Sequence, residues 1–294
     1  MTIKQLAQRT AAHWRSTFTF EKTINWFPGH MAKGVKQMRD QLRAVDLVVE
    51  TRDARIPLSS INQQFEDIVG KKSRLIVYNK SDLAPVSVQA VMERELRART
   101  GHPVLFTDAI GDNSSVRRIL TAAVDNSRAN PTRYASQYTI MVVGMPNVGK
   151  SSLINALRRV GVGRKKAALT GAKPGVTRAL SSRIKVLDVP PVYLVDTPGV
   201  MAPHIADPET AVRVALTGGI SDDVADHTVL ADYLLFRLNR FASDYSAVLR
   251  IDHPTDDVNE LAAMLAVRIG ALLKGGALDT EKALRYFLRC YREG

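Results

Sequence analysis

The sequence predicts an α/β fold: a mainly parallel β-sheet with helices on both faces, followed by a small all-helical domain. Strand-like apolar runs alternate with helical patterns between residues 45 and 195. This alternation is typical of parallel sheets. The strand signal ends near residue 206, and only helical periodicity continues after it. We therefore expect one domain over residues 25–206 and a helical domain over 207–294.

The elements of the sheet domain follow one another in chain order. An apolar stripe from Val35 to Val45 predicts a first helix. Further stripes predict helices around 88–96, 116–124 and 153–157. Uninterrupted apolar or β-branched runs predict strands at 45–50, 74–78, 103–106, 138–143, 183–187 and 192–195.

The helical domain is predicted to begin at Asp207-Pro208. An Asp cap followed by proline in the first turn is a typical helix start. Apolar residues at helical spacing then recur over 230–241, 258–272 and 284–291.

Composition excludes several classes. Apolar residues make up 45% of the 294, too many for a mainly disordered chain. Because Cys290 is the only cysteine, the chain can form neither an intrachain disulfide framework nor a cysteine-built metal site. No run approaches the roughly 18 apolar residues of a membrane helix. The chain carries a net charge of +12, and its excess of basic residues lies within the first 215 residues, which favours a polyanionic partner such as nucleic acid.

Residues 1–24 are expected to form a basic leader or arm. The first twenty contain Lys4, Arg9 and Arg15 but no acid. This composition is typical of a mitochondrial transit segment, which we favour. A short basic arm that helps to bind RNA is the alternative.

Gly144-Met145-Pro146-Asn147-Val148-Gly149-Lys150-Ser151 matches the phosphate-binding pattern G-x-x-x-x-G-K-[ST] between a predicted strand and a predicted helix. Backbone N–H groups of such a loop surround β- and γ-phosphates. Lys150 would bridge the phosphates, and Ser151 would bind Mg²⁺. The residues expected to contact nucleotide here are Asn147, Val148, Gly149, Lys150, Ser151 and Ser152.

Asp196-Thr197-Pro198-Gly199 follows the last predicted strand, 46 residues after Lys150. Asp196 can hold Mg²⁺ through water, and the Gly199 N–H can meet the γ-phosphate. Thr177 lies between the two motifs, where a switch threonine would close on Mg²⁺ and the γ-phosphate. An ordinary turn and a simple loop threonine are the alternatives.

Asn79-Lys80-Ser81-Asp82 ends the strand at 74–78. The Asp82 carboxylate can accept from N1–H and the 2-amino group of guanine, and adenine offers neither donor. An ATP-using enzyme is therefore disfavoured. Asn79 and Lys80 are expected to brace this base loop against the phosphate loop. After the strand at 103–106, the backbone N–H of Ala109 could reach guanine O6, although such small residues carry little information.

The motif order is unusual: N-K-x-D comes first, the phosphate loop second and D-x-x-G last. The same sheet can form if the chain is circularly permuted. This order, the segment Asn25-Trp26-Phe27-Pro28-Gly29-His30-Met31 and the segment Asp53-Ala54-Arg55-Ile56-Pro57 together resemble the circularly permuted GTPases that assemble the large ribosomal subunit. The resemblance covers roughly residues 25–294 and is greatest to the mitochondrial branch.

The resemblance implies a GTP/GDP-binding GTPase that acts late in assembly of the mitochondrial large subunit and leaves after hydrolysis. It implies rRNA, ribosomal proteins and other assembly factors as partners, in the matrix, and leaves open a peripheral contact with the inner membrane. Val200 occupies the place after D-x-x-G where many GTPases carry a water-orienting glutamine. The resemblance therefore points to His30 as the catalytic group, with packing of the N-terminal turn as the alternative. It also points to Asn147 as a K⁺ ligand.

Nine basic residues and no acid lie between residues 158 and 185. A solvated charged loop is the usual explanation for such a run. Because this run borders the nucleotide motifs and the family partner is RNA, we expect it to meet RNA phosphates. The RNA-binding candidates are Arg158, Arg159, Arg164, Lys165, Lys166 and Lys173.

Two other functions stay open. One is a GTP-dependent rRNA-binding checkpoint module with little hydrolysis, which Val200 favours. The other is a signalling or membrane-associated GTPase, against which the basic charge of the GTPase half weighs.

Overall fold

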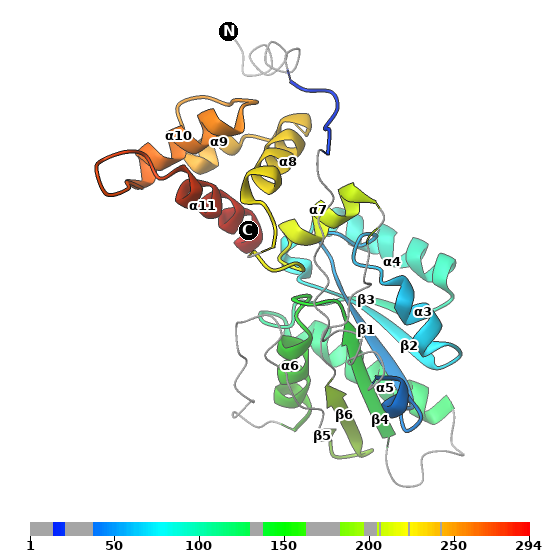
Figure 1. Ribbon diagram of the computed structural model, residues 1–294. Coiled ribbons are helices and arrows are strands. Elements are labelled where there is room, and N and C mark those ends of the chain that lie inside the picture. The colour runs from blue at the N-terminus through cyan, green and yellow to red at the C-terminus, as the bar shows by residue number, and fades with distance from the viewer. Residues whose placement is uncertain are drawn as a thin grey trace. The chain divides into compact units, whose positions relative to one another are not determined.

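The computed structural model describes residues 14–20, 38–129, 138–162, 183–196, 205, 207–222, 224–241 and 243–294. The chain divides into two compact units (Figure 1). One is Phe27–His204, and the other combines Met1–Trp26 with Ile205–Gly294.

The first unit contains a six-stranded sheet in the order β3-β2-β1-β4-β6-β5. All neighbouring strands are parallel except β5 and β6, which are antiparallel. The predicted mainly parallel α/β fold is therefore confirmed. The strands are β1 (Leu47–Asp53), β2 (Ser73–Asn79), β3 (Val104–Phe106), β4 (Tyr138–Gly144), β5 (Ile184–Leu187) and β6 (Val192–Asp196).

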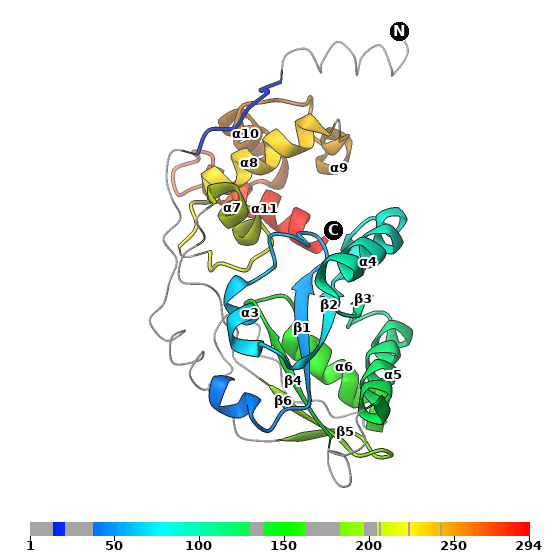
Figure 2. The same ribbon diagram turned by 90° about the vertical axis from the view of Figure 1, so that its right-hand side faces the viewer.

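Helices cover both faces of the sheet (Figure 2). On one face, α5 (Asn113–Ala129) and α6 (Lys150–Val162) pack against alternate strand residues such as Val49 and Ile140. On the other face, α3 (Gln63–Val69), α4 (Val86–Thr100) and the helical turn at 38–42 pack against the intervening residues. The strands are buried on both sides, which explains their continuous apolar runs.

The sheet differs from expectation in two places. The first strand extends to Asp53 rather than ending at residue 50, because Glu50 and Arg52 form a buried ion pair that makes polar residues tolerable inside the strand. Helix α3 was not predicted. Its apolar residues Phe65, Ile68 and Val69 have helical spacing, but seven residues give only a weak periodic signal.

The topology brings the sequence motifs to one edge of the sheet. Strand β1 pairs with β2 on one side and with β4 on the other. Because the chain turns outward in both directions from this pair, β1 and β4 flank a topological switch point, where open α/β sheets bind ligands. Asn79, Gly144 and Asp196 end the parallel strands β2, β4 and β6 at that edge.

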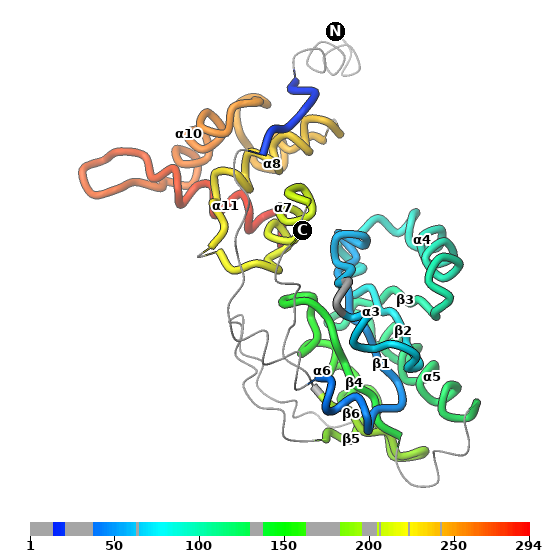
Figure 3. The backbone as a smooth tube through the Cα atoms, turned by 45° about the vertical axis from the view of Figure 1, so that its right-hand side comes forward, coloured from blue at the N-terminus to red at the C-terminus, as the bar shows by residue number. Residues whose placement is uncertain are grey.

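The second unit is helical, and its helices begin at Asp caps. Each of the five caps, namely Asp207, Asp226, Asp244, Asp257 and Asp279, accepts a hydrogen bond from a backbone N–H in the first turn. These caps start α7 (Pro208–Leu216), α8 (His227–Arg240), α9 (Tyr245–Leu249), α10 (Val258–Ile269) and α11 (Thr280–Glu293). Helices α8, α10 and α11 pack against one another (Figure 3). The helix start predicted at Asp207-Pro208 is confirmed.

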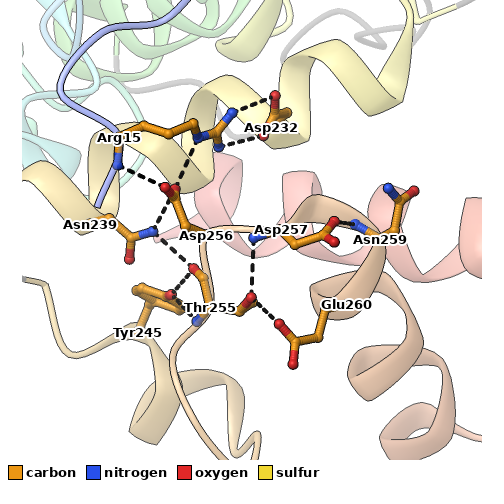
Figure 4. A network of polar contacts seen from close by, with 9 residues as sticks. All are labelled: Arg15, Asp232, Asn239, Tyr245, Thr255, Asp256, Asp257, Asn259 and Glu260. Carbon is orange, nitrogen blue, oxygen red and sulfur yellow. Dashed lines mark hydrogen bonds and ion pairs between the residues drawn. The ribbon is translucent and has the colours of Figure 1, made fainter. Parts of the chain in front are cut away.

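Residues 14–20 also belong to the helical unit. The Arg15 guanidinium donates to both carboxylate oxygens of Asp232, at 2.6 and 3.0 Å (Figure 4). The backbone N–H and Nε of Arg15 donate to Asp256, at 2.8 and 3.1 Å. This part of the expected leader is thus packed on folded structure rather than separate from it.

No helix within the described parts of the chain has both the length and the apolar character needed to cross a bilayer.

Candidate nucleotide-binding site

The loop between β4 and α6 has the tight backbone that phosphate binding requires. At Gly144 a Cβ would collide with the Thr51 carbonyl oxygen of β1, so only glycine fits. Asn147 has a φ of 58° and Gly149 a φ of 93°, both in the left-handed region. Alternation of this kind turns successive N–H groups inward and makes an anion-binding concavity.

The first turn of α6 completes this loop. Its backbone N–H groups at Ser151 and Ser152 have no partner within the helix ladder, and the helix dipole favours an anion there. Lys150 is 8% exposed and its ammonium donates to the Met145 carbonyl at 2.8 Å, so the side chain folds back along the loop. The glycine-lined loop and the buried lysine fit the phosphates of a nucleotide.

Asn79 joins the base loop to the phosphate loop. Its Nδ2 donates to the Val148 carbonyl at 3.0 Å, and its Oδ1 accepts from the Ala109 N–H at 3.1 Å. The contact is so close that a Cβ at Gly149 would collide with Asn79 Nδ2. One buried side chain therefore links the loops that follow β2, β3 and β4.

Lys80 and Asp82 lie beside this junction. Lys80 has a left-handed φ of 61°, and the Ser81 N–H donates to the Thr107 carbonyl at 3.1 Å. Asp82 lies in a short 3-10 helix, Ser81–Leu83, and is exposed, so its carboxylate is accessible to a ligand. The Lys80 ammonium lies 3.2 Å from Asp53 Oδ2. The expected bracing of the phosphate loop by Lys80 stays a prediction.

The strand register explains why Lys80 meets Asp53. Asp53 ends β1 directly opposite Asn79 in the parallel register, so a carboxylate lies next to the start of the base loop. Arg55 also holds that carboxylate, through its backbone N–H, Nε and Nη2 at 3.0, 3.0 and 2.7 Å. Burial alone would raise the pKa of Asp53, but the hydrogen bonds from Arg55 and the charge of Lys80 lower the pKa overall. Burial lowers the pKa of Lys80, and the Asp53 charge opposes that shift.

Sequence reasoning did not single out Asp53 and Arg55 as site residues. They entered only as part of the family-like segment Asp53–Pro57. The available signal was an acid directly after a buried strand, at the edge where Asn79 was already expected.

The Ala109 N–H, a candidate donor to guanine O6, is used by Asn79 in this structure. Its loop is held by Thr107, whose hydroxyl lies 2.8 Å from the Ser115 hydroxyl of α5. Ala109 is 3% exposed. A base could share this N–H only by adjusting the loop or by forming a three-centre bond.

Ser151 and Asp196, two of the expected Mg²⁺ ligands, lie on elements connected through β4. Asp196 ends β6 opposite Val142 of β4, and Ser151 lies in the first turn of the helix that β4 leads into. A hydroxyl and a carboxylate are oxygen donors of the kind Mg²⁺ prefers.

Several predicted residues lie outside the described part of the chain: His30, Thr177, Gly199, Arg164, Lys165, Lys166 and Lys173. Of the other basic candidates, Arg158 is half-buried on α6. Arg159 is exposed and donates to Asn113 Oδ1 at 3.3 and 2.9 Å.

Comparisons with known proteins agree with this geometry. A family profile described as a 50S ribosome-binding GTPase matches residues 139–267. The mitochondrial ribosome-associated GTPase 1 of Bos taurus is 39% identical and covers 100% of this chain and 93% of its own length. The mitochondrial GTPase 1 of Aedes aegypti is 40% identical, covering 92% and 91%. Mitochondrial GTPase 1 of Schizosaccharomyces pombe is 34% identical, covering 95% and 90%.

Among solved structures, that of GNP-bound YlqF from T. maritima superposes with a TM-score of 0.60 at 23% identity. It covers 89% of this chain and 94% of its own. The GDP-bound structure of the same protein gives a TM-score of 0.58 at 22% identity. These likenesses establish a common fold.

A parallel sheet whose edge carries N-K-x-D, a phosphate loop and the Asp196 that begins D-x-x-G, in permuted chain order, defines a circularly permuted P-loop GTPase. Such an enzyme binds GTP and GDP and hydrolyses GTP. Because relatives above 30% identity match it along nearly the whole chain, this protein belongs to the family of the mitochondrial ribosome-associated GTPases.

Proposed function

We propose that this GTPase binds the precursor of the mitochondrial large ribosomal subunit as a late assembly factor and leaves after GTP hydrolysis. The supporting observation is the pairing of a phosphate loop and an N-K-x-D loop at one edge of the sheet with a relative named mitochondrial and ribosome-associated that matches 100% of the chain. The same names support a mitochondrial location, and the matrix is the compartment where such a subunit is made.

In the proposed hydrolysis, the phosphate loop binds the nucleotide through the N–H groups of residues 147–152. Lys150 stabilises charge on the phosphates, and the Gly199 N–H meets the γ-phosphate. Ser151, Asp196 and Thr177 would hold Mg²⁺, which when bound neutralises phosphate charge. His30 orients the attacking water, because Val200 can neither donate nor accept a hydrogen bond. Asn147 would hold K⁺, which when bound would supply positive charge.

Basic residues support the RNA part of the proposal. The run from 158 to 185 carries nine positive charges without an acid, next to the phosphate loop helix. Phosphate contacts from this run would position the enzyme on rRNA, and its other partners would be ribosomal proteins and further assembly factors. A peripheral contact with the matrix face of the inner membrane is compatible with the same charge.

The central experiment measures GTP turnover by the purified protein alone and with mitochondrial large subunits. We expect stimulation by the subunits. His30→Ala should remove most of the stimulated rate and leave GDP affinity unchanged. Cosedimentation with large subunits should weaken when Arg164, Lys165 and Lys166 are reversed to glutamate, and binding should then depend less on salt.

Binding that is unchanged across a salt series in the triple variant would contradict the RNA-contact proposal. Tight GTP binding without stimulation by subunits would favour the second candidate, a GTP-dependent rRNA-binding checkpoint module. That alternative is motivated by Val200 at the place of the usual glutamine.

A further inference from the structure

Asp53 stands at the junction of two motifs that are separate in sequence. Its side chain is 2% exposed at the end of β1, and the neighbouring Ala54 N–H donates to the Asn79 carbonyl at 2.9 Å. Asp53 therefore lies directly behind the first residue of the base loop. A buried carboxylate at this position needs partners to offset its loss of hydration.

Both carboxylate oxygens of Asp53 have cationic partners. Oδ1 accepts from the backbone N–H and Nε of Arg55, and Oδ2 accepts from Arg55 Nη2 at 2.7 Å. Oδ2 also lies 3.2 Å from the Lys80 ammonium. Arg55 fixes the orientation of the carboxylate, since a bidentate guanidinium pair is directional. The carboxylate in turn fixes the end of the Lys80 side chain.

Lys80 lies between Asn79, which joins the base loop to the phosphate loop, and Asp82, which is expected to read the base. A lysine side chain in solution samples many rotamers, and ordering it on binding costs affinity. In this protein the Lys80 side chain is 25% exposed. Its backbone has a left-handed conformation, and its ammonium is held by Asp53. These two anchors restrict the conformations open to the lysine side chain.

We propose that Asp53, oriented by Arg55, is a positioning residue that presets Lys80 for guanine-nucleotide binding. This inference rests on the proposed role of residues 79–82 in recognising guanine. It explains why an Asp-x-Arg pair ends the strand that neighbours the base loop. It also separates two tasks: Asp82 reads the 2-amino group of guanine, while Asp53 and Lys80 set affinity without reading that group.

The test compares GDP with IDP, whose hypoxanthine base lacks the 2-amino group. In the full-length protein, Asp53→Asn should weaken both nucleotides by about tenfold and leave the GDP-to-IDP ratio unchanged. Lys80→Met should give a similar loss. The double variant should lose no more than Lys80→Met alone, because the two residues act through one contact. Glu95→Gln, which breaks an exposed ion pair with Arg99 on α4, is the matched control.

Wild-type GDP affinity in Asp53→Asn would overturn the proposal, and so would losses that multiply in the double variant, since these indicate general weakening of the fold. If Asp53→Asn melts below the assay temperature, Lys80→Met tests the proposal instead. Unchanged GDP affinity in Lys80→Met would overturn it, because Asp53 is proposed to act only through Lys80. A different result would contradict the proposed recognition of guanine by residues 79–82: the wild type would bind ADP as tightly as GDP.

A second, independent observation concerns the N-terminal segment. Phe18 packs against Tyr233 and Phe236 with ring centroids 5.3 and 5.6 Å apart, and Phe20 lies 5.8 Å from Tyr233. Thr17 and Thr19 are exposed between these half-buried rings, as in an extended strand with one face inward. With the four hydrogen bonds of Arg15, these contacts make residues 15–20 part of the helical unit.

We infer that the mature protein retains these residues, so that any cleavage of a mitochondrial leader occurs before Arg15. Cleavage after residue 20 would remove the partner of Asp232 and uncover the Tyr233 and Phe236 rings. Mass spectrometry of the chain recovered from mitochondria should find an N-terminus at or before residue 15. An N-terminus beyond residue 15 would overturn the inference.

Thermal unfolding supplies a second measurement on the full chain. Arg15→Ala should lower the melting temperature by about 2–4 °C. Arg99→Ala, at an exposed i,i+4 pair, is the control and should have little effect. Equal melting temperatures for Arg15→Ala and wild type would contradict a structural role for the segment.

Discussion

The side-chain amide of Asn79 donates to the Val148 carbonyl at 3.0 Å, across 69 positions of sequence. Through this bond the loop expected to recognise the base touches the loop expected to bind phosphate. The Asn79 oxygen also accepts from the Ala109 N–H. The loops that follow β2, β3 and β4 therefore all contact one buried amide.

Replacing Asn79 should therefore cost both stability and nucleotide affinity. Asn79→Ala leaves the Val148 carbonyl and the Ala109 N–H buried without their partner, and we expect a loss of about 2 kcal/mol in the free energy of unfolding. Urea unfolding measures this loss, and GDP titration measures affinity. Asn259→Ala, at an exposed position on α10, should change neither. Full stability in Asn79→Ala would show that the loops hold together without the bridge.

A buried ion network inside the sheet should matter more than any surface pair. Glu50 accepts from Arg52 at 2.7 Å and from Arg74 at 3.4 Å, and all three side chains are 2% exposed. Glu50→Gln leaves two buried guanidinium groups facing a neutral amide, so we expect a loss of about 3–5 kcal/mol in unfolding free energy.

Glu66→Gln is the internal control for this network. Glu66 also pairs with Arg74, but its side chain is 43% exposed, so water can replace it. The loss should be much smaller than for Glu50→Gln in the same chemical denaturation experiment. Equal losses would mean that burial does not determine the strength of these pairs.

Acid should weaken the helical unit through Asp222. Hydrogen bonds from Arg292 lower the pKa of Asp222 below its ordinary value of 3.8. The folded protein then binds fewer protons than the unfolded chain at acidic pH, so the contribution is present above the ordinary pKa and is lost as pH falls through the folded pKa. The urea midpoint should decline below about pH 5.

Asp222→Asn should flatten that decline. Asp125→Asn, at an exposed carboxylate of α5, should leave the slope as in the wild type. A wild-type slope in Asp222→Asn would show that other carboxylates control acid sensitivity.

Turnover should depend on the monovalent cation through Asn147. Asn147 takes a left-handed conformation in the phosphate loop, with a φ of 58°. If its oxygen holds K⁺, GTP hydrolysis should be faster in KCl than in NaCl, and Asn147→Ala should abolish the difference. Rates are compared at equal ionic strength, with Asn259→Ala as the control. Equal wild-type rates in the two salts would contradict the K⁺ site.

Much of the fold could be predicted because its signals are local. The apolar runs at 74–78 and 138–143 and the cap at Asp207 each need only neighbouring residues to be interpreted. Parallel strands end at one edge, so the motifs after residues 78, 143 and 195 could be expected to meet. Helix α3 was missed because two turns provide too little periodicity. The end of β1 was placed too early because Glu50 and Arg52 are charged, and their ion pair cannot be recognised from the sequence alone.

The sequence by itself determined the class of this protein: a permuted order of phosphate and base motifs on a parallel sheet, followed by a helical unit. Tertiary structure alone decided that Lys80 meets Asp53, and that Arg15 meets Asp232, 217 residues away. Secondary structure and motifs depend on short-range spacing. These pairs depend on strand register and helix packing, which bring distant side chains together only in the folded chain.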